Sequence, residues 1–185
     1  MTAYSIAGLV GVMLVWVPIS FAATPPPDSL VARQQAENLA KLPPLVPHGG
    51  IDHSGRKQKG RASFYAHHFT DRKMADGSRF HPNSDAAASK SLPLGTVARV
   101  TNQQNGKTAV VQVEDRGPHV GVRVLDVAPK VADHLDMKKA GVTQVVVAPI
   151  AVPQPNGAVK LGAGAAESNP QEVTIATKRA QAAAH

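Results

Sequence analysis

Between residues 97 and 148 the chain alternates short Val-rich runs with turn signals. The runs occupy residues 97–101, 108–113, 123–127 and 144–148. Asn105-Gly106 separates the first two runs, and this dipeptide is a strong short-range signal for a β-hairpin. From residue 129 to 140 the apolar positions follow helical spacing, and Gly141 supplies a C-terminal stop. Several short strands around one helix, without long βαβ alternation, predict a small closed or nearly closed β-barrel.

The segments that flank this region have a different character. Residues 23–59 are rich in Pro and Gly, which predicts a linker, interrupted by a short helix over about residues 28–42. Residues 151–185 are rich in Ala, Gly and Pro, which predicts a disordered tail. We therefore expect a mainly β domain at residues 60–150, with one or two short helices and flexible tails on both sides.

The N-terminal segment predicts export. Residues 1–22 carry no charged side chain, and the apolar stretch 6–19 has the length of a secretory signal core. Pro18 interrupts the helix, and the small residues Ser20 and Ala22 predict cleavage after Ala22. An uncleaved N-terminal anchor is the alternative, and it is the one way in which we expect the chain to contact a membrane. Both alternatives predict an exported, periplasmic protein.

Composition narrows the classes of function. Of the 185 residues 43% are hydrophobic and 4% aromatic, and the formal net charge is +7. A basic surface attracts polyanions such as nucleic acid, an anionic membrane or an acidic cell-wall polymer. Nucleic acid is not expected as a partner, because the sequence has no interleaved aromatic platform and export removes the chain from the cytoplasm. The absence of Cys excludes a disulfide framework, a Cys nucleophile and a lipoprotein anchor.

Two acidic positions are candidates for chemistry. Asp115 follows an apolar strand and precedes Gly117-Pro118, which places its carboxyl group at a barrel mouth. Arg116 beside it could keep the carboxylate ionised or bind an anionic substrate. The alternative is an ordinary strand-end Asp that caps a turn. Asp126 lies within an apolar strand and needs hydrogen-bond donors, either as a structural residue or as part of a site.

The histidines do not indicate a metal site. His67 and His68 are adjacent, and the other six are scattered along the chain. The sequence contains neither a His-Glu-x-x-His helix nor a Gly-x-Ser-x-Gly elbow. We therefore predict no metal and no cofactor.

Taken in order, several short strings resemble one family. They are residues 61–65 (RASFY), 75–80 (ADGSRF), 91–96 (SLPLGT), 100–102 (VTN), 105–107 (NGK) and 115–118 (DRGP), followed by Gly121, Arg123 and Asp126. Together they resemble the rare lipoprotein A (RlpA-like) family of septal peptidoglycan lytic transglycosylases, whose fold is a double-psi β-barrel. The resemblance covers about residues 60–150 and implies a six-stranded barrel of that type.

The resemblance also implies a site. The family is thought to use a Glu, a His and an Asp at its glycan cleft. Asp115 corresponds to the Asp, whereas Ser78 and Ser89 occupy the Glu and His positions. On this resemblance Asp115 is the expected catalytic acid and base, and His81 or His68 is a candidate to replace the missing imidazole. The expected substrate-binding residues are Tyr65, Asn102, Arg116, Arg123 and Asp126.

Two functions remain open at this point. The first is an endolytic transglycosylase that cleaves peptidoglycan glycan strands to 1,6-anhydro products, which the retained Asp115 favours. The second is a module of the same fold that binds glycan without cleaving it, which Ser78 and Ser89 favour. In both cases the expected partner is the peptidoglycan glycan strand, and a monomer is expected.

Overall fold

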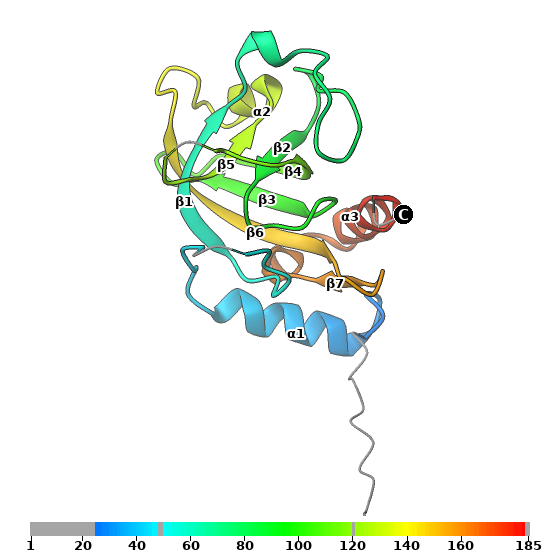
Figure 1. Cartoon of the computed structure of the whole chain (residues 1–185). Helices are drawn as coiled ribbons and strands as arrows, with labels where there is room; N and C mark the ends of the chain where they lie inside the picture. The colour runs from blue at the N-terminus through cyan, green and yellow to red at the C-terminus, as the bar shows by residue number, and fades with distance from the viewer. Residues whose placement is uncertain (1–24, 48–49, 120, 184–185) are drawn as a thin grey trace, which may run out of the picture.

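Six strands close into a barrel in this computed structural model, which describes residues 25–47, 50–119 and 121–183. The strands are β1 (Gln58–Phe64), β2 (Ala86–Ser89), β3 (Val97–Asn102), β4 (Thr108–Asp115), β5 (Arg123–Val127) and β6 (Thr143–Pro153). Neighbours follow the order β1-β5-β2-β4-β3-β6, and antiparallel pairing of β1 with β6 closes the ring (Figure 1). A further strand, β7 (Val159–Leu161), pairs with β6.

The direction of the strands identifies the type of barrel. β1 is parallel to β5 and β2 is parallel to β4, whereas every other neighbouring pair within the ring is antiparallel. Two parallel pairs inside a closed six-stranded ring form the double-psi β-barrel, so the predicted fold class is confirmed. The predicted hairpin is also confirmed, because Thr101 of β3 lies opposite Thr108 of β4 and Gly106 turns the chain with a φ of +73°.

Small and β-branched side chains fill the barrel. Along β4, Val111 and Val113 are buried while Gln112 between them is partly exposed, as expected for a strand with one face in the core. The fully buried Leu125, Leu135 and Met137 close the interior on the side of β5 and the following helix. The low aromatic content therefore does not prevent a packed core, because a narrow barrel needs short side chains at its interior positions.

The helices differ from the prediction in number and length. The described residues contain α1 (Leu30–Lys41), α2 (Pro129–His134) and α3 (Pro170–Ala182), together with the 3₁₀ turns η1 (His67–Phe69) and η2 (Ala163–Glu167). The helix expected over 129–140 was predicted too long. It ends at His134 because Asp136 adopts a left-handed φ of +53° and the Met137 amide bonds back to the Ala132 carbonyl oxygen at 3.0 Å.

The segment before the barrel is more ordered than a linker. The predicted helix is confirmed as α1, which Ser29 caps by accepting a hydrogen bond from the Ala32 amide at 3.0 Å. Leu45 forms a parallel bridge with Gln58. Gly55 packs closely on Gly162, since a Cβ placed on Gly55 would lie only 2.9 Å from the Cα of Gly162. The linker prediction for residues 23–59 is therefore wrong for these parts, because their backbone is fixed against the barrel.

The prediction of a disordered tail at 151–185 is wrong for residues 151–183. This segment completes β6 and forms β7, η2 and α3, which lies beside the barrel (Figure 1). Ala176 and Ala180 of α3 are buried against Val97 and Ile150. The many Ala and Gly residues that indicated disorder instead allow close packing, because short side chains let a helix approach the outer surface of a strand.

The predicted signal at residues 1–22 lies outside the described residues. Within the part of the chain that the structure describes, no helix has both the length and the apolar character needed to cross a membrane.

Candidate active site

Asp115 ends β4 and receives three hydrogen bonds. Its Oδ2 accepts from the Tyr65 hydroxyl at 2.8 Å. Its Oδ1 accepts from the backbone amides of Ala75 at 2.9 Å and Arg116 at 2.8 Å. The carboxyl group is therefore held in one orientation by three different segments of the chain, while the residue stays partly exposed. Such an oriented, accessible carboxylate can accept a proton from a bound ligand.

A second carboxylate lies in the same row of the sheet. Asp126 on β5 is opposite Ser63 of β1 on one side and Ala88 of β2 on the other, and Ala88 is in turn opposite Asp115. Residues directly opposite in neighbouring strands share a face. The two Asp residues are thus separated by one strand, or about 9–10 Å at about 4.8 Å per strand. Ala88 between them is itself 2% exposed.

Asp126 finds its donors within the protein. The Ser63 hydroxyl donates to its Oδ1 at 2.5 Å, and Arg123 Nε lies 3.3 Å from the same oxygen. The structure therefore satisfies the need for donors predicted for a carboxylate inside an apolar strand. Both Arg123 and Asp126 remain partly exposed, at 29% and 17% of their side chains, so they border the mouth rather than the core. Their contact with substrate stays a prediction.

Tyr65 positions Asp115. It directly follows β1, and its amide bonds to the Val127 carbonyl oxygen at 3.0 Å. Its ring packs on Phe80 with centroids 4.4 Å apart and meets Phe69 edge-on at 5.6 Å. Burial raises the pKa of the Tyr65 hydroxyl well above its usual value, and the hydrogen bond to Asp115 raises it further. The hydroxyl therefore stays protonated and acts as a donor.

The positions of the two serines are now clear. Ser78 lies in a tight turn, where its amide and its hydroxyl donate to Asp76 Oδ1 at 2.9 and 2.7 Å. Ser89 is fully buried, and its Oγ accepts from the amides of Ser91 and Leu92 at 3.3 and 3.1 Å. Ser89 therefore has a structural role in this turn, and its buried side chain cannot contact a ligand.

Arg116 also serves this turn. Its Nη1 donates to the carbonyl oxygens of Ser89 at 3.2 Å and Leu92 at 2.6 Å. Burial lowers the pKa of the guanidinium group, an effect that the neighbouring Asp115 opposes. The side chain thus anchors the chain between β2 and β3, and a substrate contact through its remaining N–H groups stays a prediction.

Asn102 is not a substrate-binding residue in this structure. Its side chain is 1% exposed, and every polar atom in it has a partner inside the protein. Nδ2 donates to the Leu135 carbonyl oxygen at 3.0 Å, and Oδ1 accepts from the Thr143 hydroxyl at 3.0 Å and the Gln104 amide at 2.9 Å. Asn102 fixes the end of β3 to β6 and to the loop after α2. The prediction of ligand binding at this position is therefore wrong.

The two candidate histidines lie on the outside of the same region. His68 stacks on Phe69 with ring centroids 4.3 Å apart, and His81 Nδ1 accepts from the Asn83 amide at 3.2 Å. Among the described residues, neither ring forms a hydrogen bond with Asp115. His, Asp and Glu side chains of the described residues form no cluster of three or more that could hold a metal ion.

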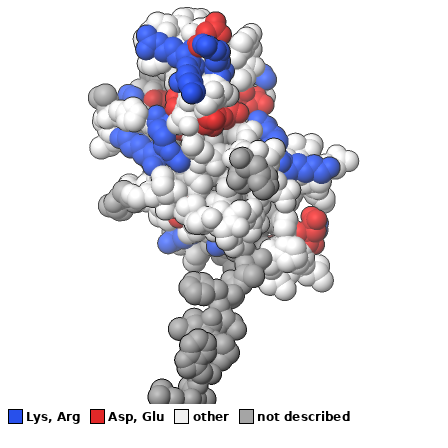
Figure 2. Space-filling model, turned by 45° about the vertical axis from the view of Figure 1, so that its right-hand side comes forward, with Lys and Arg blue, Asp and Glu red and all other residues white. Residues whose placement is uncertain are grey.

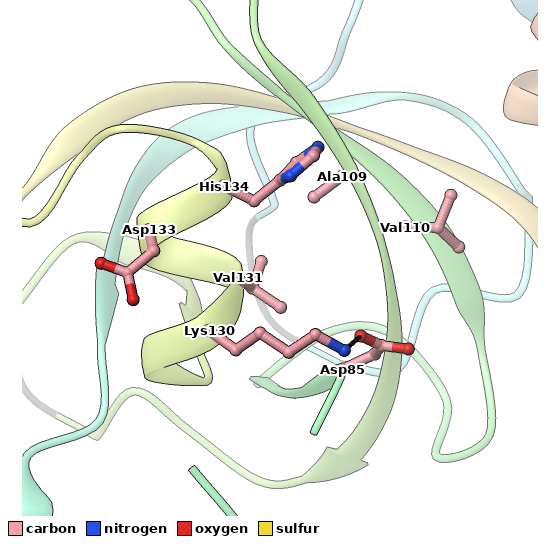
Figure 3. Close-up of a pocket in the computed structure, with 7 residues that line it drawn as sticks. All are labelled: Asp85, Ala109, Val110, Lys130, Val131, Asp133 and His134. Carbon is pink, nitrogen blue, oxygen red and sulfur yellow. Dashed lines mark hydrogen bonds and ion pairs between the residues drawn. The ribbon is translucent and has the colours of Figure 1, made fainter. Parts of the chain in front are cut away.

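Two hollows lie beside β4, and Asp115 lines neither of them. The first has a volume of about 380 Å³ and is bordered by Val110, by Val131 and His134 of α2, and by the ion pair of Lys130 with Asp85 (Figure 3). The second has a volume of about 430 Å³ and lies between Val110 and α3. Neither lining contains a Trp, Tyr or Phe ring on which a sugar could stack, so the Asp115 region remains the candidate site.

The closed barrel and the donor-bound Asp115 at its mouth define a double-psi β-barrel domain with a polar site. Comparison with known proteins agrees. Residues 57–147 match the family model described as "Lytic transglycolase". The probable endolytic peptidoglycan transglycosylase RlpA of Treponema pallidum is 44% identical over 89 residues, which cover 48% of this chain and 28% of that relative. The endolytic peptidoglycan transglycosylase RlpA of Neisseria meningitidis is 41% identical over 90 residues, covering 49% of this chain and 38% of that relative.

The domain at residues 57–147 thus belongs to the RlpA-like family of lytic transglycosylase domains, and the predicted resemblance is confirmed. The chain matches well under half of the length of these two relatives. Among solved structures, Streptomyces papain inhibitor is similar with a TM-score of 0.41 and 22% identity, over 51% of this chain and 94% of that protein.

Proposed function

We propose that this chain cleaves peptidoglycan glycan strands between N-acetylmuramic acid and N-acetylglucosamine and leaves 1,6-anhydro products. The observation that carries the proposal is the geometry of Asp115, a partly exposed carboxylate with a donor to each oxygen. In this reaction the C6 hydroxyl of the muramic acid attacks C1 of the same sugar, so no water is consumed. A base must take the hydroxyl proton, and Asp115 is oriented for that role.

The setting of the reaction follows from the same proposal. Residues 1–22 have the pattern of an export signal, and peptidoglycan lies outside the inner membrane. The relatives with 44% and 41% identity carry the name of endolytic peptidoglycan transglycosylases, which supports the substrate class.

The test uses purified sacculi from which the stem peptides have been removed. The unmodified chain is expected to release 1,6-anhydromuramyl products that mass spectrometry detects. Asp115→Asn should abolish release, and Glu37→Gln, an exposed position on α1, should leave it unchanged. If the unmodified chain releases no such product, the proposal fails.

A second candidate function is a module that binds glycan without cleaving it. Ser78 and Ser89 favour it, because neither side chain can transfer a proton as a Glu or His does. The same experiment separates the two functions. Co-sedimentation of the chain with sacculi in the absence of any anhydro product would favour the binding module.

A further inference from the structure

Glu114 is the extra residue of a β-bulge at the mouth of the barrel. In a regular strand, neighbouring side chains point to opposite faces. The pairing of β2 with β4 shifts at this point, because Ala87 lies opposite Val113 and Ala88 lies opposite Asp115. One residue of β4 is therefore unpaired, and bulges of this kind re-aim side chains next to active sites. The negative charge of Glu114 is one of those that raise the pKa of the Tyr65 hydroxyl, the group that donates to Asp115.

The turn that contains Ser78 holds Glu114 in place. The Asp76 amide donates to the Glu114 carbonyl oxygen at 3.0 Å, while the amide of the preceding residue, Ala75, donates to the Asp115 carboxyl group at 2.9 Å. One short turn therefore fixes both acidic residues at the end of β4. The Asp76 carboxylate is itself oriented by its two hydrogen bonds from Ser78.

The groups around Glu114 favour its protonated form. Burial raises the pKa of the Glu114 carboxyl group, and the neighbouring Asp76 and, more weakly, Asp85 raise it further. Arg179 of α3 opposes this effect. The charge of Arg179 is shared, because its Nη1 lies 3.9 Å from Asp85 and its Nε donates to Gln112. Asp85 also pairs with Lys130 of α2 at 3.1 Å (Figure 3).

Asp115 has the opposite surroundings. Its three contacts within the described chain are all with donors, one from a hydroxyl and two from backbone amides. These contacts fix the orientation of the Asp115 carboxyl group, which accepts in all three. At the bulge, Glu114 therefore directly precedes an oriented carboxylate that can accept a proton, while its own surroundings favour the protonated form.

Resting on the proposed transglycosylase function, we propose that Glu114 is the catalytic proton donor and that Asp115 is the base. The Glu114 proton passes to the glycosidic oxygen as the bond between that oxygen and C1 of the muramic acid breaks. The C6 oxygen forms the new bond to C1, and its proton passes to Asp115. Transfer of that proton from Asp115 back to Glu114 through solvent restores both groups, so water is neither consumed nor released.

The test compares the unmodified chain with Glu114→Gln, Asp115→Asn and the matched control Glu37→Gln. The rate of 1,6-anhydromuramyl formation from peptide-free sacculi is measured from pH 4 to pH 9. Glu114→Gln is expected to lower the rate about 10²- to 10⁴-fold, which is typical of losing a general acid. In the unmodified chain the rate should decline at alkaline pH, because Glu114 then loses the proton that it donates. The remaining activity of Glu114→Gln should not show this decline. Glu37→Gln should behave as the unmodified chain does.

A second variant keeps the test decisive if Glu114→Gln folds poorly. Asp76→Asn removes a negative charge that raises the pKa of Glu114, so the alkaline limb of the rate profile should move to lower pH. A purely structural role of Glu114 would not move that limb. If Glu114→Gln cleaves at the unmodified rate with an unchanged profile while Asp115→Asn is inactive, the assignment of Glu114 is overturned and the proposed function stands. If the unmodified chain forms no anhydro product, both are overturned.

Discussion

The carboxyl group of Asp115 accepts three hydrogen bonds from the protein before any ligand binds. The amides of Ala75 and Arg116 are parts of the backbone and cannot turn away, whereas the Tyr65 hydroxyl can rotate about its C–O bond. In the proposed reaction, the Tyr65 hydroxyl is the one of these three donors that can turn when Asp115 takes up a proton. Tyr65 is therefore the positioning residue of this carboxylate.

Tyr65→Phe tests this role. The variant keeps the ring that packs on Phe80 and removes only the hydroxyl that donates to Asp115. We expect glycan cleavage to fall about tenfold and the free energy of unfolding to fall by about 1 kcal/mol, the net contribution of one hydrogen bond. Product release and urea denaturation measure the two effects. Cleavage at the unmodified rate would show that Asp115 needs no such donor.

Glu114 should make stability depend on pH. Its pKa is raised in the folded chain, so between the ordinary Glu pKa of about 4.3 and the raised value the folded state holds the proton more tightly than the unfolded state. This contribution to the free energy of unfolding is complete at lower pH and is lost as pH rises through the folded-state pKa. Glu114→Gln cannot titrate, so it should gain stability relative to the unmodified chain as pH rises. Urea denaturation from pH 4 to pH 8 measures the difference, and parallel curves would contradict the prediction.

At the residue scale the sequence located the mouth of the barrel but not all of its chemistry. Asp115 follows an apolar strand and precedes Gly117-Pro118, a pattern visible without a structure. Two features need the three-dimensional arrangement. The bulge that makes Glu114 a candidate depends on pairing with β2, and the burial of Asn102 depends on its contacts with β6. Residues 100–102 correctly indicated the family, yet a motif alone does not distinguish an interior residue from a ligand-binding residue.

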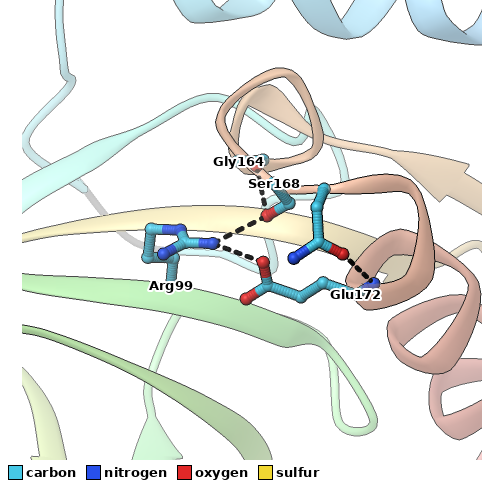
Figure 4. Close-up of polar contacts among 5 residues, drawn as sticks. Arg99, Gly164, Ser168 and Glu172 are labelled. Atoms are coloured by element: carbon cyan, nitrogen blue, oxygen red, sulfur yellow. Dashed lines mark hydrogen bonds and ion pairs between the residues drawn. The ribbon is translucent and has the colours of Figure 1, made fainter.

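Among the elements, α3 is held to the barrel by a compact polar cluster (Figure 4). Arg99 Nη2 on β3 donates to Glu172 Oε2 at 2.6 Å and to the Ser168 hydroxyl at 3.1 Å, and that hydroxyl donates to the Gly164 carbonyl oxygen at 2.9 Å. The side chains of Arg99 and Glu172 are 19% and 23% exposed, so solvent screens their attraction only in part. The cluster therefore fixes the start of α3 to the central part of the barrel.

Glu172→Ala should loosen α3 without unfolding the barrel. The change leaves the Arg99 guanidinium without its carboxylate, and we expect a loss of about 1–2 kcal/mol, less than the about 3–5 kcal/mol typical of a fully buried pair. Hydrogen exchange of residues 170–182 should become faster, while exchange in β4 changes little. Lys178→Ala, an exposed change on the same helix, is the control. Equal exchange in the two variants would contradict the role of the pair.

The elements that the sequence predicted best are those with a local signal. The Asn105-Gly106 hairpin needs only its own residues to form, and the prediction was correct. The ordered segment 151–183 could not be predicted in the same way, because its Ala and Gly residues are stabilised by the outer surface of β3 and β6, which is distant in sequence. Composition measures how a segment behaves alone, and this segment packs on a surface that the barrel provides.

At the scale of the whole molecule, the charged side chains are unevenly distributed over the surface. The formal net charge of the chain is +7, yet acidic side chains gather in a band on the face seen in Figure 2, with basic side chains beside and above them. A neutral sugar chain gains little from the net positive charge. If peptidoglycan is the substrate, as proposed, the carboxylates of its stem peptides should be attracted to the basic side chains, and salt should weaken that attraction.

Salt should therefore affect two forms of the same polymer differently. Co-sedimentation with peptide-bearing sacculi is expected to weaken severalfold between 50 and 500 mM NaCl, because the Debye length shortens from roughly 14 Å to about 4 Å. Under the proposed function, binding to peptide-free glycan rests on hydrogen bonds and van der Waals contacts, so it should change little over the same range. Bound fractions measured on both preparations make the comparison. Equal salt dependence of the two preparations would mean that the basic side chains do not recognise the peptide carboxylates.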